Sequence, residues 1–243
     1  MTDTTDATAA PRVVDREAFE AEVAMLRERE KAHTRAGDAL AAARRRLPMV
    51  EVDARTPIVG EHGTTTLREA FEGRRILLAY YFMWHQGKPA SGQCEGCTYF
   101  TDQVRALPVP RSRDVTYATF CQGPYAESRR YRDFMGWEQA WYSVEGALDA
   151  LLGARRHNTM YLVGYLRQGD RVFETWWTTL RGVEAMDNAY RLLDLTVYGR
   201  QEVWEESPPG WPQLDWDRTM RRDGRPIAQW PRLAAGHDDA LGG

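Results

Sequence analysis

The stretch Ile76-Leu77-Leu78-Ala79-Tyr80-Tyr81-Phe82-Met83 is the segment from which the fold of this chain can be inferred. Its apolar residues run almost without interruption and do not alternate with polar ones, which is typical of a β-strand buried on both faces. The loop 84–93 separates it from Cys94-Glu95-Gly96-Cys97, and a segment with helical periodicity follows. This order predicts a sheet edge that carries reversible thiol chemistry or binds a soft metal ion.

The segments that follow this unit predict a mixed α/β sheet. Residues 115–121 are the next strand candidate, and Gly123-Pro124 opens another helix. A right-handed crossover makes the two strands parallel. The β-rich runs 159–166 and 171–178 are joined by a short turn containing glycine and predict an antiparallel hairpin, and an amphipathic helix over 183–193 follows. The order βαβα and then ββα is the thioredoxin-like arrangement.

The remaining sequence divides the chain into four parts. Residues 1–12 are small and polar, and we expect them to be disordered. Residues 13–48 form a long helical arm capped by Asp15, with a narrow apolar stripe that packs on the body or on a partner subunit and so provides a route to a homo-oligomer. Residues 49–204 form the thioredoxin-like domain. Residues 205–243 are rich in proline and tryptophan, which predicts an irregular tail strapped over the body.

Composition excludes several classes of protein. A chain of 243 residues with 43% hydrophobic side chains is long enough for one sizeable core. Its net charge of −3 provides no general attraction for nucleic acid or an anionic membrane surface. No apolar run approaches the roughly 20 residues that span a bilayer, and the acidic start lacks the features of a signal peptide. We therefore expect a cytoplasmic protein, where a durable structural disulfide is disfavoured.

Six short patches in fixed order carry a family resemblance. They are Leu47-Pro48, Tyr81-Phe82-Met83, the Cys94 and Cys97 pair, Arg113-Asp114-Val115, Phe134-Met135-Gly136-Trp137 and Tyr198-Gly199-Arg200-Gln201-Glu202. Together they resemble the bacterial thioredoxin-like family catalogued as domain of unknown function 899. The resemblance covers about residues 12–204 and implies a thioredoxin-like fold with a helical N-terminal arm.

The cysteine pair predicts dithiol–disulfide exchange. A helix N-terminus stabilises a thiolate, which makes Cys94 the nucleophile that attacks a disulfide substrate. Cys97, one turn further along, resolves the mixed disulfide, and a thiol reductant restores the pair. Glu95 opposes this, because a neighbouring carboxylate raises the pKa of the thiol. Peroxidase chemistry is a weaker alternative, because the Pro-x-x-x-Thr-x-x-Cys pattern of peroxiredoxins is not filled before Cys94.

A metal site is the main alternative to redox chemistry. His85 follows the first central strand, Cys121 closes the neighbouring strand, and His157 precedes the hairpin. All three are expected at the sheet edge that carries Cys94 and Cys97. Two or three thiolates together with imidazole suit Zn(II) or Cu(I).

The substrate groove is expected to differ from that of a thioredoxin. Thioredoxins place a cis-proline directly before the first hairpin strand, against the cysteines. This chain has no proline between Pro124 and Pro208, and cis bonds are essentially confined to proline. Since that proline also helps to keep metals off the cysteines, its absence favours the metal alternative.

A third alternative is an interaction module. In that case the arm and the tail form a dimer or partner interface, and the cysteines have no catalytic role.

Overall fold

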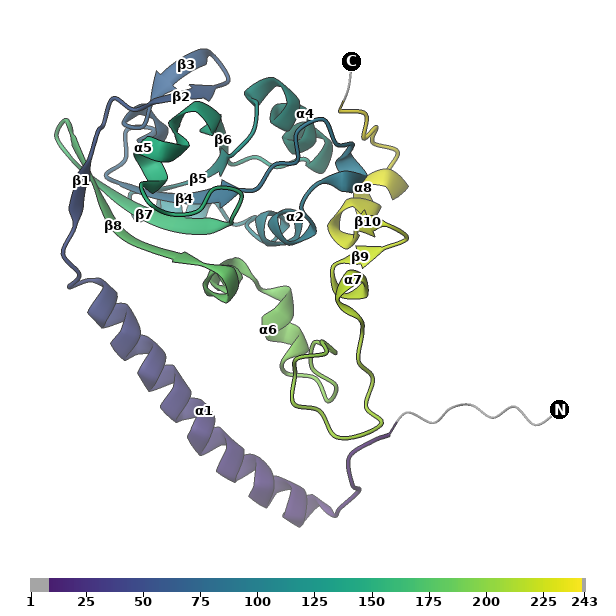
Figure 1. Ribbon diagram of the computed structural model, residues 1–243. Coiled ribbons are helices and arrows are strands. Elements are labelled where there is room, and N and C mark those ends of the chain that lie inside the picture. The colour runs from purple at the N-terminus through teal and green to yellow at the C-terminus, as the bar shows by residue number, and fades with distance from the viewer. Residues whose placement is uncertain (1–8, 242–243) are drawn as a thin grey trace.

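Figure 1 shows the computed structural model, which describes residues 9–241. The body is an eight-stranded mixed sheet with the order β1-β8-β7-β4-β5-β6-β2-β3. Its strands are β1 (Val50–Val52), β2 (Pro57–Gly60), β3 (Gly63–Thr66), β4 (Ile76–Phe82), β5 (Val115–Cys121), β6 (Ala140–Ser143), β7 (Tyr161–Gln168) and β8 (Arg171–Thr179). Its main helices are α2 (Glu95–Asp102), α3 (Pro108–Arg111), α4 (Tyr125–Met135), α5 (Leu148–Leu152) and α6 (Ala189–Leu193).

Strand β4 lies at the centre of this sheet, as its apolar sequence predicts. It pairs in parallel with β5, from Ile76 opposite Val115 to Phe82 opposite Cys121, and antiparallel with β7 on its other side. Its side chains enter two cores. One core includes Tyr80 and Phe82 and also holds the cysteines, while the other is filled from the opposite face of the sheet. A strand with both faces covered has no polar face, which explains why the run does not alternate.

The predicted βαβ unit and the antiparallel hairpin are confirmed. Strands β4 and β5 are connected through α2 and α3, and β7 pairs with β8 around a turn at Gly169. An earlier hairpin, β2 with β3, joins the far edge of the sheet. The fold is therefore thioredoxin-like, with β4 leading into the cysteines and the β7–β8 hairpin completing the sheet.

Two strands of the sheet were not expected from the sequence. Strand β6, the sequence Ala-Trp-Tyr-Ser, pairs in parallel with β5, and a bridge from Val59 to Ser143 links it to the first hairpin. Strand β1 pairs with the outer edge of β8. Strands of three or four residues show little periodicity, so their positions depend on the neighbours that pair with them.

The helices differ from their expected lengths for local reasons. Helix α2 ends at Asp102, where the Arg105 side chain donates to the Asp102 carbonyl, and Leu107, beyond the end of the helix, packs in the core that holds the cysteines. The helix expected over 183–193 is divided into a 3₁₀ segment, η4 (Leu180–Met186), and α6. Asp187 causes this division, because its extended backbone and its carboxylate, which accepts from the Tyr190 N–H, begin a new helix.

The N-terminal arm is helix α1 (Arg16–Arg44), which begins where Asp15 accepts a hydrogen bond from the Ala18 N–H. Figure 1 shows α1 extending away from the sheet. All of its residues are described and none is buried, so its apolar stripe does not pack on the body, and packing on a partner subunit stays a prediction. Phe19 stays 49% exposed.

The C-terminal tail packs on the body beside α2, as predicted. It carries short elements rather than long ones, namely α7 (Trp216–Thr219), β9 (Arg221–Arg222), β10 (Arg225–Pro226), η5 (Ile227–Gln229) and α8 (Trp230–Ala234). Figure 1 shows these elements lined up along the side of the sheet that carries α2. Within residues 9–241, no helix combines the length and apolar content that crossing a bilayer requires. Of the segment 1–12 that was expected to be disordered, residues 1–8 lie outside the described residues.

Candidate active site

The two cysteines lie at the start of α2, which follows β4 and the loop 84–93. Cys94 is the N-cap residue of α2, and its sulfur accepts a hydrogen bond from the Cys97 N–H (N to Sγ 3.3 Å). The Cys97 sulfur accepts from the N–H of Met83, the residue after β4 (3.4 Å). All the cysteines are free thiols. Cys94 is 7% exposed and Cys97 is fully buried, so solvent and substrate reach Cys94 first.

The environment of Cys94 favours the thiolate. The Cys97 thiol donates to the Cys94 sulfur and lowers the pKa of Cys94, and the backbone N–H groups of Cys97 and Gly96 lower it further. Burial and the carboxylate of Glu95 act in the opposite direction, but the pKa remains below its ordinary value. The helix N-terminus and the neighbouring thiol therefore outweigh Glu95, a balance that the sequence left open.

Cys97 is held in the protonated form. Burial raises the pKa of Cys97 well above its ordinary value, and the proximity of Cys94 raises it further. The Tyr80 hydroxyl lies near Cys97 without the geometry of a hydrogen bond and has no other partner in the described part of the chain. Burial and the nearby sulfurs raise the pKa of Tyr80 as well. The two cysteines thus differ, since Cys94 is slightly exposed and has a lowered pKa while Cys97 is fully buried and has a raised pKa.

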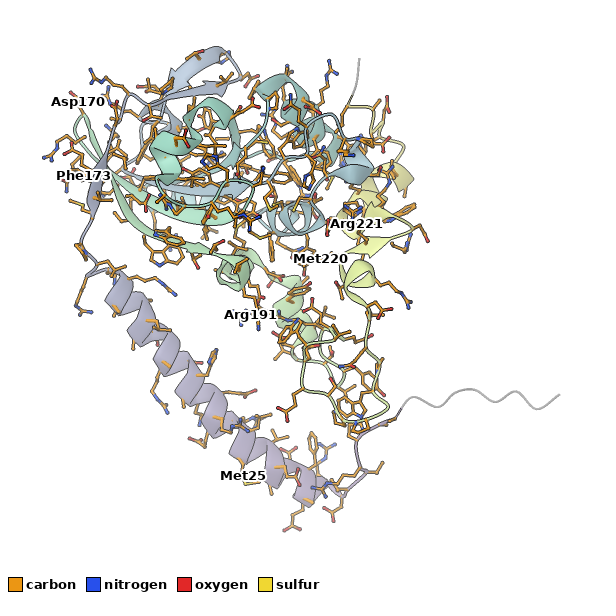
Figure 2. All side chains as sticks on the ribbon, in the orientation of Figure 1. Met25, Asp170, Phe173, Arg191, Met220 and Arg221 are labelled. Atoms are coloured by element: carbon orange, nitrogen blue, oxygen red, sulfur yellow. The ribbon has the colours of Figure 1, made fainter. Side chains whose placement is uncertain are left out.

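Arg221 from the tail neutralises Glu95. Its guanidinium forms an ion pair with the Glu95 carboxylate (Nη2 to Oε2 3.0 Å). It also donates to the carbonyl oxygens of Ser91 (2.8 Å) and Gln93 (2.9 Å), in the loop that leads to Cys94. Figure 2 shows Arg221 beside the start of α2. The tail therefore supplies the positive charge that offsets the carboxylate between the two cysteines.

A second contact from the tail braces the backbone of Cys94. The amide of Gln229 donates to the Tyr131 hydroxyl (2.6 Å), which lies 2.7 Å from the Thr98 hydroxyl. Thr98 in turn donates to the Cys94 carbonyl (2.7 Å). Because the Thr98 proton is used on Cys94, Tyr131 must donate to Thr98. This fully satisfied chain of hydrogen bonds links the tail to the first turn of α2.

The position that thioredoxins give to a cis-proline is occupied differently. Within residues 9–241 no peptide bond is cis. The side chain of Gln122, directly after β5, accepts from the Asn158 N–H (2.9 Å) and donates to the Thr159 carbonyl (3.0 Å). These two bonds hold the loop before β7, and the next residue, Met160, lines the pocket at Cys94.

A pocket of about 650 Å³ lies in front of Cys94. Its lining is mainly apolar and comes from segments far apart in the sequence, among them α2 with Gly96, η4 with Leu180 and the tail with Met220. The volume falls in the range of small-molecule sites. The Cys94 residue therefore lines a mainly apolar pocket that can hold a substrate against its sulfur.

The structure does not support a metal site built from the five predicted ligands. Among residues 9–241, no group of three or more His, Cys, Asp and Glu side chains is placed to hold a metal ion. His85 is exposed on its loop, and His157 pairs with Asp149 (3.2 Å). Cys121 lies in the same core as the cysteine pair, but burial raises its pKa to about 12, which opposes the thiolate that zinc and copper require. The expected convergence on Cys94 and Cys97 does not occur.

Sequence reasoning missed the residues that the tail brings to the site. Met220 and Arg221 carry no motif, and more than 120 residues separate them from the cysteines. The prediction of a tail strapped over the body indicated where such contacts arise, but not which side chains make them. Gln122 and Gln229 are buried amides, and buried amides in a sequence give no signal until their partners are known.

The chain was compared with family models, with curated proteins and with solved structures. A family model described as bacterial protein of unknown function, domain 899, matches residues 8–223. A peroxiredoxin Q structure from Xanthomonas campestris is similar at 14% identity, with 58% of this chain and 92% of that chain covered and a TM-score of 0.42. A putative thiol:disulfide interchange protein DsbE from Chlorobium tepidum is similar at 12% identity, with 58% and 94% covered and a TM-score of 0.39. The comparison with curated proteins found no match.

Proposed function

The chain belongs to the bacterial protein family of unknown function 899, and we propose that it acts as a dithiol–disulfide oxidoreductase in which Cys94 attacks and Cys97 resolves. The observation that carries this proposal is the unequal environment of the two sulfurs. Cys94 borders the pocket and has a lowered pKa, while Cys97 is fully buried and has a raised pKa. Nucleophilic attack needs an accessible thiolate, and resolution needs a second thiol that competing reagents do not reach.

The reaction proceeds in two exchanges. The Cys94 thiolate attacks one sulfur of a substrate disulfide, which forms a mixed disulfide on Cys94 and releases the first substrate thiolate. That thiolate takes up the proton of Cys97, and the Cys97 sulfur attacks Cys94. The second substrate thiolate leaves as the Cys94–Cys97 disulfide forms. The substrate gains two electrons, the protein loses two, and a thiol reductant reverses the change on the protein.

Loss of the Cys94 charge assists the second exchange. In the resting pair the Cys94 sulfur raises the pKa of Cys97. Once Cys94 is bonded to substrate it is neutral, so its contribution to the raised pKa of Cys97 disappears. The pKa of Cys97 then falls, and the Cys97 thiolate forms more easily. The Met83 N–H, which already donates to the Cys97 sulfur, stabilises the thiolate as it forms.

Thiol counting tests the proposal. Reduced protein, unfolded and titrated, shows three thiols, because the chain has three cysteines. After mild oxidation of the folded protein we expect one thiol, and dithiothreitol should restore all three. Cys94→Ser should abolish the loss.

Cys97→Ser is the matched variant, because it leaves the nucleophile in place. It should accumulate a mixed disulfide between Cys94 and substrate, which intact-mass spectrometry detects. A folded protein that loses no thiols under oxidation, or a Cys97→Ser variant that traps no substrate, would overturn the proposed function.

A further inference from the structure

The pocket at Cys94 has the form of a small-molecule site and not of an open surface that binds another protein. At about 650 Å³ it has the size of typical small-molecule sites. Met220 of the tail and Leu180 of η4 lie on either side of α2 and form two walls of the pocket. Figure 2 shows Met220 extending from the tail toward α2. A substrate must enter between these walls to reach the sulfur.

The walls nearest Cys94 are apolar and adaptable. They include Met83, Phe100, Met160 and Met220. The side chains of Met160 and Met220 approach the Cα of Gly96 so closely that an added Cβ there would lie 3.7 Å from an atom of each. Methionine side chains are flexible and polarizable, and they are common on surfaces that accept varied apolar ligands. These walls favour a substrate with an apolar body.

Leu180 provides an independent indication of a ligand. It is 68% exposed at the rim of the pocket, and its backbone is left-handed, with a φ of 49°. A leucine in this conformation is strained, and strained residues cluster at positions that clamp ligands. An apolar ligand in the pocket would cover the exposed side chain.

The charges at the pocket are already paired. The pairs are Arg221 with Glu95 (3.0 Å), Arg181 with Glu184 (2.9 Å) and Arg200 with Glu184 (3.1 Å), and the Tyr190 hydroxyl donates to Glu202 (2.7 Å). The guanidinium groups at the pocket therefore each have a carboxylate partner within the described residues. Because these carboxylates and guanidinium groups offset one another, an anionic substrate would find no excess positive charge at the pocket.

From these observations we infer that the substrate is a neutral, apolar disulfide of low molecular mass. The inference rests on the proposed function. One substrate sulfur bonds to Cys94, the other leaves as a thiolate, and Cys97 then displaces the first, so that one disulfide becomes two thiols while the protein dithiol becomes a disulfide. An added dithiol such as dithiothreitol returns the protein to its reduced form.

A matched pair of substrates tests the inference. Reduced protein is mixed with diphenyl disulfide or with bis(4-carboxyphenyl) disulfide, which differs by two carboxylates. Each rate of thiol release is divided by the rate of the same disulfide with free dithiothreitol, which removes differences in intrinsic reactivity. We expect the normalised rate to favour diphenyl disulfide by about tenfold or more, because burying a carboxylate in a mainly apolar pocket without an unpaired cation is unfavourable.

Leu180→Lys tests the position of the site. It adds a positive charge at the rim of the pocket, and it should reduce or invert the preference for diphenyl disulfide. Leu195→Lys is the control, because Leu195 is 79% exposed and lies outside the pocket. Equal normalised rates, or a preference that Leu180→Lys does not alter, would overturn this inference while the cysteine cycle stands. Absence of any Cys94–Cys97 disulfide would overturn the proposed function as well.

Discussion

Replacing Arg221 with glutamine should raise the pKa of Cys94 by somewhat less than one unit. Arg221 forms an ion pair with Glu95, and it is the positive charge of this pair that offsets the carboxylate beside the cysteine. With that charge removed, the Glu95 carboxylate acts on the Cys94 thiolate without compensation. The pKa must rise, because a nearby negative charge disfavours a second one.

The magnitude follows from distance and screening. A unit charge about 7 Å away, roughly two Cα spacings, interacts by about 0.6 kcal/mol in water and about 2.4 kcal/mol at an effective dielectric constant of 20. The Arg221 and Glu95 side chains are 23% and 31% exposed, so the value lies between these limits. A net change of about 1 kcal/mol corresponds to somewhat under one pKa unit.

The assay is the pH dependence of Cys94 alkylation by iodoacetamide. In the unaltered protein the rate should rise through a midpoint at lower pH than for an ordinary cysteine thiol, because the pKa of Cys94 is lowered. Arg221→Gln should move the midpoint to higher pH, and Glu95→Gln should move it to lower pH. In the double variant the midpoint should not lie above that of the unaltered protein.

Arg222→Gln is the control for this experiment. Arg222 is the next residue, its side chain is 65% exposed, and its ion pair is with Asp223 rather than with the site. It should leave the midpoint unchanged. A folded Arg221→Gln protein whose midpoint stays fixed or moves to lower pH would refute the reasoning.

Three further predictions concern stability, reactivity and assembly. Gly123→Ala should destabilise the protein by about 2–3 kcal/mol and lower its Tm by about 4–12 °C in calorimetry. The reason is that an added Cβ would lie 2.1 Å from Cδ1 of the buried Trp84, whereas in the control variant Gly146→Ala the added Cβ meets nothing within 4 Å and the Tm should not fall. Alkylation at pH 8 followed by peptide mapping should leave Cys121 unmodified until the protein is unfolded, since burial raises its pKa to about 12, and rapid labelling of the folded protein would contradict this. We propose that the exposed stripe of α1 mediates self-association, so Phe19→Glu should weaken a dimer seen by sedimentation equilibrium, and an unaltered protein that stays monomeric at about 100 μM would count against it.

The sequence by itself was sufficient for the features that depend on neighbours along the chain. The unbroken apolar run 76–82 predicted the central strand, because a strand covered on both faces has no polar positions. Asp15 predicted the start of α1, because a cap acts within one helical turn. Cys94 and Cys97, three residues apart after that strand, predicted the place of the thiol pair, and the helix at whose N-terminus they lie is formed by the residues that follow them.

The environment of that pair required the tertiary structure. Arg221 reaches Glu95 across 126 positions of sequence, and Gln229 reaches Tyr131, which helps to brace Cys94, across 98. The proposed metal ligands also show that local sequence does not determine which side chains meet. His157 was expected to lie with Cys94 and Cys97 at one edge of the sheet, but it pairs with Asp149. Local patterns specify which elements form, because their hydrogen bonds and side-chain periodicity are short-range. Which charges and amides meet at the cysteines depends on how the tail packs, and this packing is decided by contacts between segments that the chain order does not place together.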